Sequence, residues 1–337
     1  MTNRQTLQNS EPEHQSPFSR EVHPWVAEGA HHLRMGVGMV GPRPSWDALL
    51  QWVEDAEALG FDSFWAADHP TMLPDCWLCL AAAAQRTWRM RLGTLVACAN
   101  YRPPALTARL ASDVDRLSGG RVVLGLGIGD IPAEFAQLGL PYGSTSERQR
   151  GLEEAIHIIY GSWYDAPFSL QGASFTTSAA ETPAPVQTPR VPLLIGGAGE
   201  RVTLRQVAMY ADVSNFGPYD LTGATSDIAG IQHKLAILRA HCETVGRPYE
   251  TVLRSHFVVL LVLAEQASAL DAKLAAVPER LRAAFASGTV ALTVTDAIAY
   301  YRALAQAGMQ YFIATMLPHD RETLHLLGSK VLPALNV

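Results

Sequence analysis

The sequence predicts an α/β protein of the TIM (β/α)8 barrel class with insertions, and three observations support this prediction. Short apolar runs of strand length alternate with amphipathic segments of helix length along the 337 residues. The runs are apolar almost throughout, as expected for parallel strands that are covered on both faces. The connections are short, and 48% of the residues are hydrophobic against 17% charged, which is enough apolar material for one large core.

Eight strands are expected, and each is followed by a helix. The strands are predicted at residues 34–40, 61–67, 91–97, 120–127, 191–195, 211–216, 252–263 and 310–314. The helices are predicted at residues 46–59, 75–87, 103–117, 147–163, 200–210, 227–245, 295–307 and 320–332. Ser45 is a suitable N-cap for the first of these helices, and Gly60 is a suitable residue to end it.

Three segments fall outside the repeat. Residues 1–33 are polar and contain no apolar signal segment, so we expect a disordered tail ahead of a barrel domain at 34–337. Insertions are predicted near 164–190 and 265–288, where they would surround the mouth of the barrel and set substrate specificity. No apolar run reaches about 18 residues, so we expect no membrane span and a cytoplasmic location.

Charge and cysteine content exclude several other classes of protein. The net charge is −6 and no basic stripe is present, so no nucleic-acid partner is expected. Four cysteines do not make a disulfide framework in a chain of this length. Cys76 and Cys79 form a C-x-x-C within a helical stretch, which favours core packing over the alternative of redox or metal chemistry. No histidine spacing is typical of a metal site, and none is predicted.

A glycine cluster follows the fifth predicted strand and leads directly into a helix. Gly196, Gly197, Ala198 and Gly199 would let backbone N–H groups approach an anion, and the helix N-terminus adds a favourable dipole. Phosphate sites in such barrels favour the later loops. A tight turn without a ligand is the alternative interpretation.

Two further strand ends carry residues suited to proton transfer. His69 follows the second strand beside Asp68, and an imidazole can exchange a proton near neutral pH. Asp130 follows the fourth strand and could supply a carboxylate across the mouth, although it could equally be an N-cap for the next segment. The glycines at 125–129 do not have the spacing of a dinucleotide-binding fingerprint, which argues against an NAD-dependent dehydrogenase.

Several collinear segments resemble one known family. These segments are FDSFWAADH, RMRLGTLVACANYRPPALTARLASDVDRLSGGRVVLGLGIGD, ERQRGLEEAIHIIYGSW and VPLLIGGAGERVTLRQVAMYADVSNF, with two further matches late in the chain. Over residues 34–335 the sequence is similar to the bacterial luciferase-like monooxygenases, and particularly to their coenzyme F-420-dependent oxidoreductases. The resemblance implies a TIM barrel that binds FMN or the deazaflavin F-420 at the mouth, and a homodimer.

The resemblance also implies roles for individual residues, taken position by position. It implies a non-proline cis peptide at Leu95-Val96, behind the ring of the cofactor. It assigns catalysis to His69 and Asp130, and a cofactor contact to Asp68. The remaining positions that it assigns to cofactor binding are Leu95, Val96, Cys98, Gly127, Ile128, Gly129, Gly196, Gly197, Ala198 and Gly199.

Two positions depart from the family pattern. Cys98 stands where relatives often have Thr or Ser, and a thiol is a poor hydrogen-bond donor. Ala133 stands where some members have an amide side chain.

From the resemblance, the leading prediction is an F-420-dependent oxidoreductase that transfers a hydride to or from a small organic substrate. An FMN-dependent monooxygenase and a non-catalytic flavin-binding barrel are the alternatives.

Overall fold

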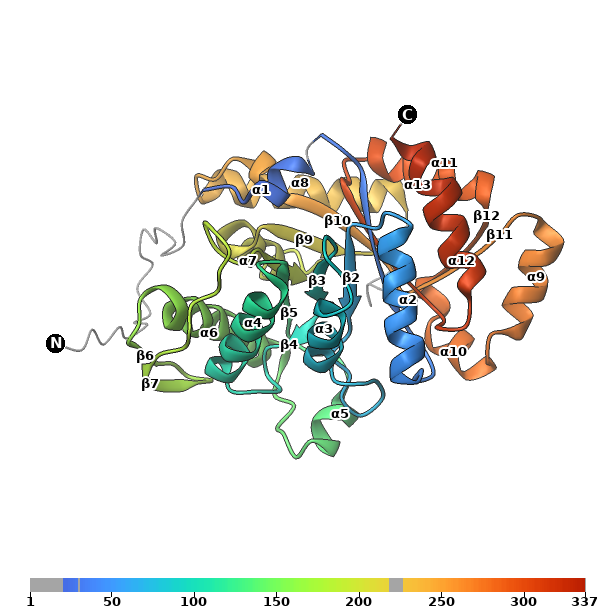
Figure 1. Cartoon of the computed structure of the whole chain (residues 1–337). Coiled ribbons are helices and arrows are strands. Elements are labelled where there is room, and N and C mark those ends of the chain that lie inside the picture. The colour runs from blue at the N-terminus through green and yellow to red at the C-terminus, as the bar shows by residue number, and fades with distance from the viewer. Residues whose placement is uncertain (1–20, 30, 218–226, 337) are drawn as a thin grey trace.

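The computed structural model describes residues 21–29, 31–217 and 227–336, and at its centre is a closed barrel of parallel strands (Figure 1). The barrel strands are β1 (Arg34–Met39), β2 (Ser63–Ala66), β3 (Arg91–Thr94), β4 (Ala97–Cys98), β5 (Val122–Gly127), β8 (Leu193–Gly196), β9 (Val213–Phe216), β10 (Leu253–Val258) and β13 (Tyr311–Met316). Their order is β3-β2-β1-β13-β10-β9-β8-β5-β4, and β3 also pairs with β5, which closes the ring. Because β3 and β4 occupy one position, the barrel has the eight positions that the sequence predicts.

Helices surround this barrel, as the alternation of the sequence predicts. The covering helices are α2 (Trp46–Ala58), α3 (Cys76–Ala84), α4 (Pro104–Ser118), α6 (Thr145–Tyr164), α7 (Thr203–Tyr210), α8 (Ile228–Thr244), α11 (Val294–Gln306), α12 (Arg321–Leu326) and α13 (Leu332–Leu335). Ser45 caps α2 by accepting the backbone N–H of Ala48, which confirms the predicted N-cap. Between helices and strands lies the larger apolar core, with Trp52, Leu80 and Phe312 fully buried in it.

The barrel interior contains a large buried indole ring. Trp65 of β2 is buried, and a Cβ added to Gly36 of β1 or Gly93 of β3 would lie about 2.2–2.3 Å from its side chain. The two glycines therefore leave the space that the indole occupies. Leu95, Val123, Leu194 and other apolar residues complete this inner cluster.

The amino end of the barrel is covered by the short helix α1 (Pro24–Glu28), and the prediction of disorder is wrong for this part of the chain. Trp25 is buried and donates from its indole nitrogen to Asp62 at 3.0 Å, while Tyr311 donates to the same carboxylate at 2.6 Å. The Arg34 and Arg91 guanidinium groups lie 5.2 and 5.3 Å from the Trp25 ring. An isolated Trp in a polar segment gave no periodic signal in the sequence. Residues 1–20 of the predicted tail lie outside the described residues.

The predicted seventh strand, 252–263, is two strands rather than one. β10 belongs to the barrel, whereas β11 (Leu260–Ala264) pairs in parallel with β12 (Thr289–Thr293) in a separate two-stranded sheet. Thr315 donates its hydroxyl to the carbonyl of Val259, the residue between the two strands. Residues 257–264 are apolar across the end of β10 and the whole of β11, so the sequence carries no break at this boundary.

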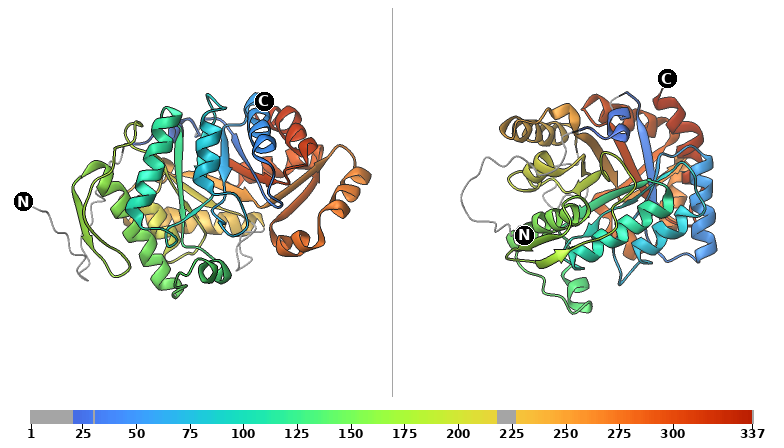
Figure 2. Two further views of the ribbon diagram at one scale, coloured as in Figure 1. Left: turned by 60° about the horizontal axis from the view of Figure 1, so that its bottom comes forward. Right: turned by 60° about the vertical axis from the view of Figure 1, so that its left-hand side comes forward.

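The two predicted insertions lie on opposite sides of the barrel (Figure 2). The first contains an antiparallel hairpin of β6 (Phe168–Gln171) and β7 (Thr176–Ala180). The second contains α9 (Ala267–Ala276) and α10 (Glu279–Ala284), which connect β11 to β12. A further short helix, α5 (Pro132–Gln137), follows β5 on the side of the molecule where the barrel strands end.

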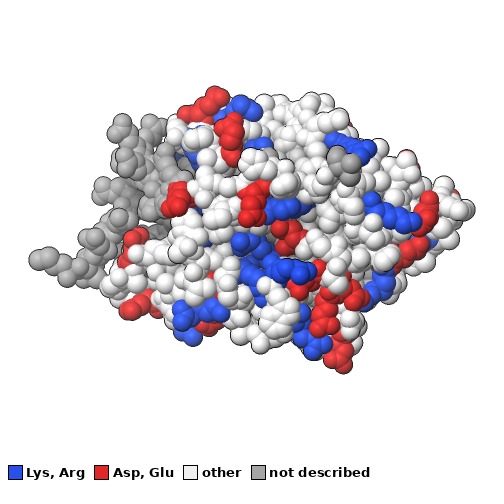
Figure 3. Space-filling view, turned by 45° about the horizontal axis from the view of Figure 1, so that its top comes forward, with Lys and Arg blue, Asp and Glu red and all other residues white. Residues whose placement is uncertain are grey.

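Charged side chains are mixed in sign on the face shown in Figure 3, where Lys and Arg lie beside Asp and Glu amid broad uncharged areas. Exposed pairs such as Arg109 and Asp113, at 2.7 Å, show this arrangement within single helices. Pairs of this kind contribute little to stability, on the order of 0.5 kcal/mol. The apolar layers therefore dominate the stability of the fold.

Two histidines are buried in this fold without a carboxylate partner in the described residues. His256 of β10 is fully enclosed, its Nδ1 has no hydrogen-bond partner, and burial lowers its pKa to about 4. His23 accepts the N–H of Trp25 on Nδ1 at 3.1 Å. Burial, and then the charges of Arg91 and Arg190, lower the pKa of His23 to about 4 as well.

These shifts predict that the protein loses stability as the pH falls from about 6.5 to about 4. Above that window both histidines are neutral in folded and unfolded chains. Within it, the unfolded chain binds protons that the folded chain does not. The free energy of unfolding then falls by up to about 1.4 kcal/mol per pH unit for each histidine.

Urea unfolding at pH 7 and pH 5 checks this expectation. The variant His256→Phe should lose about 2 kcal/mol less between these two pH values than the wild type loses. His319→Gln, at an exposed position, should behave like the wild type. Equal pH dependence in His256→Phe and the wild type would contradict the assignment.

Candidate active site at the carboxyl ends of the strands

A buried carboxylate accepts hydrogen bonds from three side chains at the mouth of the barrel. Glu134, in the first turn of α5, is 2% exposed and accepts from His69 Nδ1 at 2.8 Å. Tyr101 donates to the same oxygen at 3.0 Å, and Thr71 donates to the other oxygen at 3.0 Å. The donors come from the loops after β2 and β4, so one carboxylate joins three segments. His69 itself remains one-third exposed, with no hydrogen-bond partner on Nε2 within the described ranges.

The acidic partner of His69 is therefore Glu134, and the structure does not bring Asp130 to it. Asp130 is exposed, and the hydrogen bond recorded for it is at its backbone carbonyl, which accepts from Tyr142 at 3.4 Å. The alternative of an N-cap is also wrong, because Ile131 occupies that position and no side chain caps α5. Sequence analysis missed Glu134 because it lies inside a helix rather than at a strand end. No spacing or period in the sequence identifies it.

Asp68 holds the neighbouring loop together. It is 4% exposed and accepts two hydrogen bonds from Arg102, at 2.6 and 2.8 Å, and the backbone N–H of Cys98 at 3.0 Å. A charge this deeply buried needs such a partner. Its hydrogen bonds thus join β2 to the start of the loop after β4, and the predicted contact with a cofactor stays a prediction.

The third barrel position contains the predicted backbone feature, since the peptide Leu95-Val96 is cis and separates β3 from β4. The Val96 side chain lies against three glycines of neighbouring strands. An added Cβ would be 3.2 Å from Val96 at Gly125, 2.5 Å at Gly127 and 3.2 Å at Gly196. The glycines at the ends of β5 and β8 therefore make room for Val96, a packing reason that the sequence interpretation did not include.

The turn after β8 has the conformation expected of a glycine-rich loop. Gly197 has a φ of 122°, which other residues rarely adopt, and its N–H donates to the Asn215 carbonyl at 2.9 Å. α7 begins at Thr203, and no side chain caps its first turn. Gln149 of α6 donates to the Thr203 hydroxyl at 2.9 Å, so this turn and the start of α6 are adjacent. Ala198 and Gly199 lie between β8 and α7, and their predicted contact with a cofactor stays a prediction.

The loop after β5 packs against Cys98. Gly129 has a φ of 76°, and a Cβ there would lie 2.7 Å from the Cys98 sulfur. Burial raises the pKa of the Cys98 thiol to about 12, so the thiol stays protonated. Burial likewise raises the pKa of Cys79 to about 12, and that of Cys76 rises in the same direction. The C-x-x-C pair is buried and free, which favours the packing interpretation.

A buried guanidinium lies beside these loops. Arg148 of α6 is 8% exposed, donates to the Gly143 carbonyl at 2.7 Å and lies 3.9 Å from the Tyr142 ring. Its Nε has no partner, and no carboxylate pairs with it in the described part of the chain. Asn100 donates to both Arg148 and Ile128 carbonyls, at 3.3 and 3.1 Å, which places this helix end against the loop after β5.

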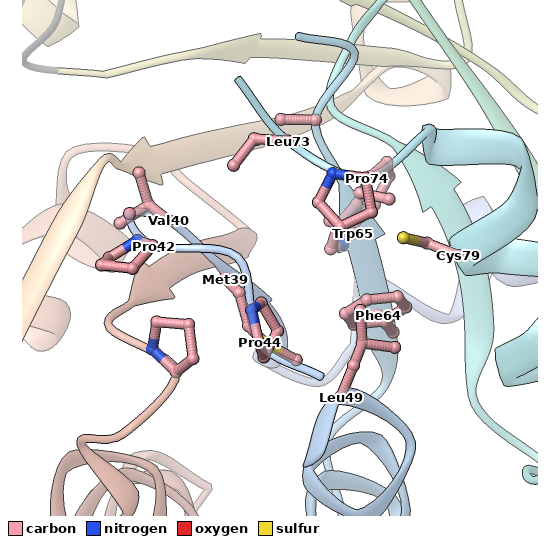
Figure 4. Close-up of a pocket in the computed structure, with 14 residues that line it drawn as sticks. Met39, Val40, Pro42, Pro44, Leu49, Phe64, Trp65, Leu73, Pro74 and Cys79 are labelled. Carbon is pink, nitrogen blue, oxygen red and sulfur yellow. The ribbon is translucent and has the colours of Figure 1, made fainter. Parts of the chain in front are cut away.

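A small apolar hollow, with a cavity volume of about 40 Å³, lies next to the turn that carries His69. Figure 4 shows Val40 and Pro42 on one side of it and Phe64 and Cys79 on the other. Leu73 also lines it, and the Leu73 N–H donates to the His69 carbonyl at 2.7 Å. No charged side chain lines this hollow.

For metal sites and membrane-spanning helices, the structure gives findings about the described residues alone. Within residues 21–29, 31–217 and 227–336, no group of three His, Cys, Asp or Glu side chains could hold a metal ion. Over the same ranges, no helix is both long enough and apolar enough to cross a membrane.

Comparison with known proteins gives one family. The family model described as luciferase-like monooxygenase matches residues 25–318. A 4-hydroxyprotoasukamycin monooxygenase of Streptomyces nodosus subsp. asukaensis is 28% identical over 207 residues, which cover 59% of this chain and 54% of that protein. An F-420-dependent glucose-6-phosphate dehydrogenase of Amycolatopsis mediterranei (strain U-32) is 30% identical over 167 residues, covering 47% and 49%. The chain spans about half the length of these curated relatives.

A solved structure agrees on the fold. The coenzyme F-420-dependent tetrahydromethanopterin reductase from Methanopyrus kandleri superposes with a TM-score of 0.75 at 18% identity, over 90% of this chain and all of that one. At this identity the match shows the TIM barrel fold alone.

The contact between Val96 and Gly127 predicts that substitutions at these two positions affect the free energy of unfolding non-additively. Gly127→Ala should destabilise the protein by about 1–3 kcal/mol, because the new Cβ would meet Val96 at 2.5 Å. In Val96→Ala the methyl group concerned is absent. The double variant should then be more stable than the sum of the two single effects by about 1 kcal/mol in urea unfolding. Strict additivity would show that the two side chains do not compete for this space.

Proposed function

The chain belongs to the luciferase-like monooxygenase family, and from this premise we propose that it is an F-420-dependent oxidoreductase acting on a small organic substrate. The observation that carries the proposal is His69. It lies at the mouth of the barrel with Nδ1 bonded to Glu134 and with Nε2 free of protein partners in the described residues. Interconversion of an alcohol and a carbonyl moves one proton for every hydride. A histidine placed in this way can exchange that proton.

The residues at the mouth fit a deazaflavin. Val96 presents an apolar bulge, and the loops after β5 and β8 approach it through glycine backbone. The turn at 196–199 and the buried Arg148 offer N–H groups and a positive charge for a phosphate. When bound, the deazaflavin supplies a two-electron hydride donor or acceptor.

The other groups of the chain bind and orient. The apolar hollow beside His69 is small and suits a small uncharged, hydrophobic group of the substrate, since no charged side chain lines it. The Asp68–Arg102 pair holds the loop that carries His69 against the loop after β4. A homodimer, expected from the resemblance, is part of the same proposal.

An FMN-dependent monooxygenase that uses reduced flavin and oxygen is the second candidate. It is supported by the similarity to 4-hydroxyprotoasukamycin monooxygenase, which covers 59% of this chain. A flavin-binding barrel without turnover is the third, and the arrangement of His69 and Glu134 argues against it. The binding experiment below separates these possibilities.

Titration of the purified protein with oxidised F-420 and, separately, with FMN tests the proposed function. We expect F-420 to bind at least ten-fold more tightly, and the bound form to be reduced by an alcohol or to reduce a ketone. A preference for FMN with oxygen consumption would replace the proposal by the monooxygenase. Binding of either cofactor without any turnover would favour the non-catalytic barrel.

Removal of the buried positive charge should weaken cofactor binding. We expect Arg148→Met to raise the Kd for F-420 by about 10- to 100-fold, because a hydrogen bond to a charged group contributes about 1.5–3 kcal/mol. Arg150→Met is the matched control, since Arg150 lies two residues along the same helix and is exposed. Equal Kd values for both variants and the wild type would remove Arg148 from the phosphate site.

A further inference from the structure

We propose that Glu134 is the positioning residue of this site, which fixes His69 as a proton acceptor that faces the substrate through Nε2. The part of this inference that concerns the reaction rests on the proposed function. The part that concerns which nitrogen of His69 carries the proton does not. Nothing in the sequence pattern singled out Glu134.

The geometry sets which nitrogen of His69 carries the proton. An ionised carboxylate can only accept hydrogen bonds, and Glu134 faces three donors: Tyr101, Thr71 and the His69 ring. The ring must therefore donate from Nδ1, and in the neutral imidazole the lone pair is then on Nε2. Burial, together with the nearby Glu134 carboxylate, raises the pKa of Tyr101, so its hydroxyl remains a donor.

Other charged groups near the cluster are already engaged. Asp68 is paired with Arg102, and Asp75 lies 3.4 Å from the same guanidinium. Cys98 is a buried thiol that stays protonated. Among the described residues, Glu134 is therefore the carboxylate that contacts His69 directly.

The same contact favours one direction of chemistry. In alcohol oxidation His69 Nε2 would accept the O–H proton as the carbon–oxygen bond becomes a carbonyl, and a bound deazaflavin would supply the acceptor for the hydride that leaves carbon. The imidazolium that forms lies 2.8 Å from the Glu134 carboxylate, which stabilises the positive charge. In the reverse direction the imidazolium returns the proton.

Two substitutions separate the charge of Glu134 from its hydrogen bonds. Glu134→Gln can keep all three contacts, because its carbonyl can accept from His69 and Tyr101 while its amide donates to the Thr71 hydroxyl. Glu134→Leu removes the acceptor altogether. Thr71→Val is the matched control, because it removes one donor to the same carboxylate and leaves the contact with His69 in place.

The first readout is independent of activity. Nitrogen-15 NMR of histidine-labelled protein, with the His69 signals assigned from their loss in His69→Asn, reports which ring nitrogen is protonated. We expect the Nδ1–H tautomer in the wild type, Thr71→Val and Glu134→Gln. In Glu134→Leu the Nε2–H form should become populated. An Nε2–H tautomer in the folded wild type would overturn the proposal even if the enzyme is active.

The second readout is the pH dependence of alcohol oxidation with F-420. In Glu134→Gln we expect kcat to fall about 10- to 100-fold, and the midpoint of the rise of kcat/KM with pH to move down by about one pH unit. Thr71→Val should keep the wild-type midpoint. An unchanged midpoint in Glu134→Gln would show that Glu134 only connects the loops and does not affect proton transfer by His69. If no variant and no wild type turned over, the proposed function would fail, while the NMR result would still decide the role of Glu134.

Discussion

The indole ring of Trp65 occupies the interior of the barrel, in space that Gly36 and Gly93 leave open on the strands to either side. Further along the strands, Val96 fills the space left by Gly127 and Gly196 in the same way. A closed barrel of eight strands has room for its own side chains and little else. Because the interior is filled, a ligand can bind only beyond Val96, in the loops that follow the carboxyl ends of the strands.

Those loops are held by carboxylates that are buried rather than exposed. Glu134 joins three segments through side-chain donors, and Asp68 ties the loop of β2 to that of β4. The same device recurs away from the site. Glu57 accepts the backbone N–H groups of residues 88–90, and Glu154 accepts those of residues 173–175. Glu57 and Glu154 thereby supply acceptors to backbone that has left the regular ladder, where an unpaired N–H would be costly.

The fold could be predicted from the sequence because strand-length apolar runs and helix-length amphipathic runs repeat with short connections. The resemblance also placed Leu95-Val96 correctly. The failures have physical causes. Residues 257–264 are apolar without interruption, so no polar residue marks the boundary between β10 and β11. Trp25 is a single buried aromatic residue in a polar segment, and one residue produces no hydrophobic periodicity that would predict its burial.

The site was predicted only in part for a similar reason. His69 follows a strand, where function is expected, and it does lie at the mouth. Asp130 also follows a strand but is exposed, whereas Glu134, four residues later in the first turn of α5, is buried and contacts His69. Strand ends predict where a loop begins, whereas the direction of a side chain depends on the helix that the loop forms.

The contact that covers the amino end of the barrel joins the two extremes of the chain. Trp25 stands close to the beginning, and its partner through Asp62 and the edge-on ring contact is Tyr311, 249 residues beyond Asp62. A ribosome makes Trp25 and Asp62 well before Tyr311, so this contact can be completed only once the segment that carries Tyr311 has been made.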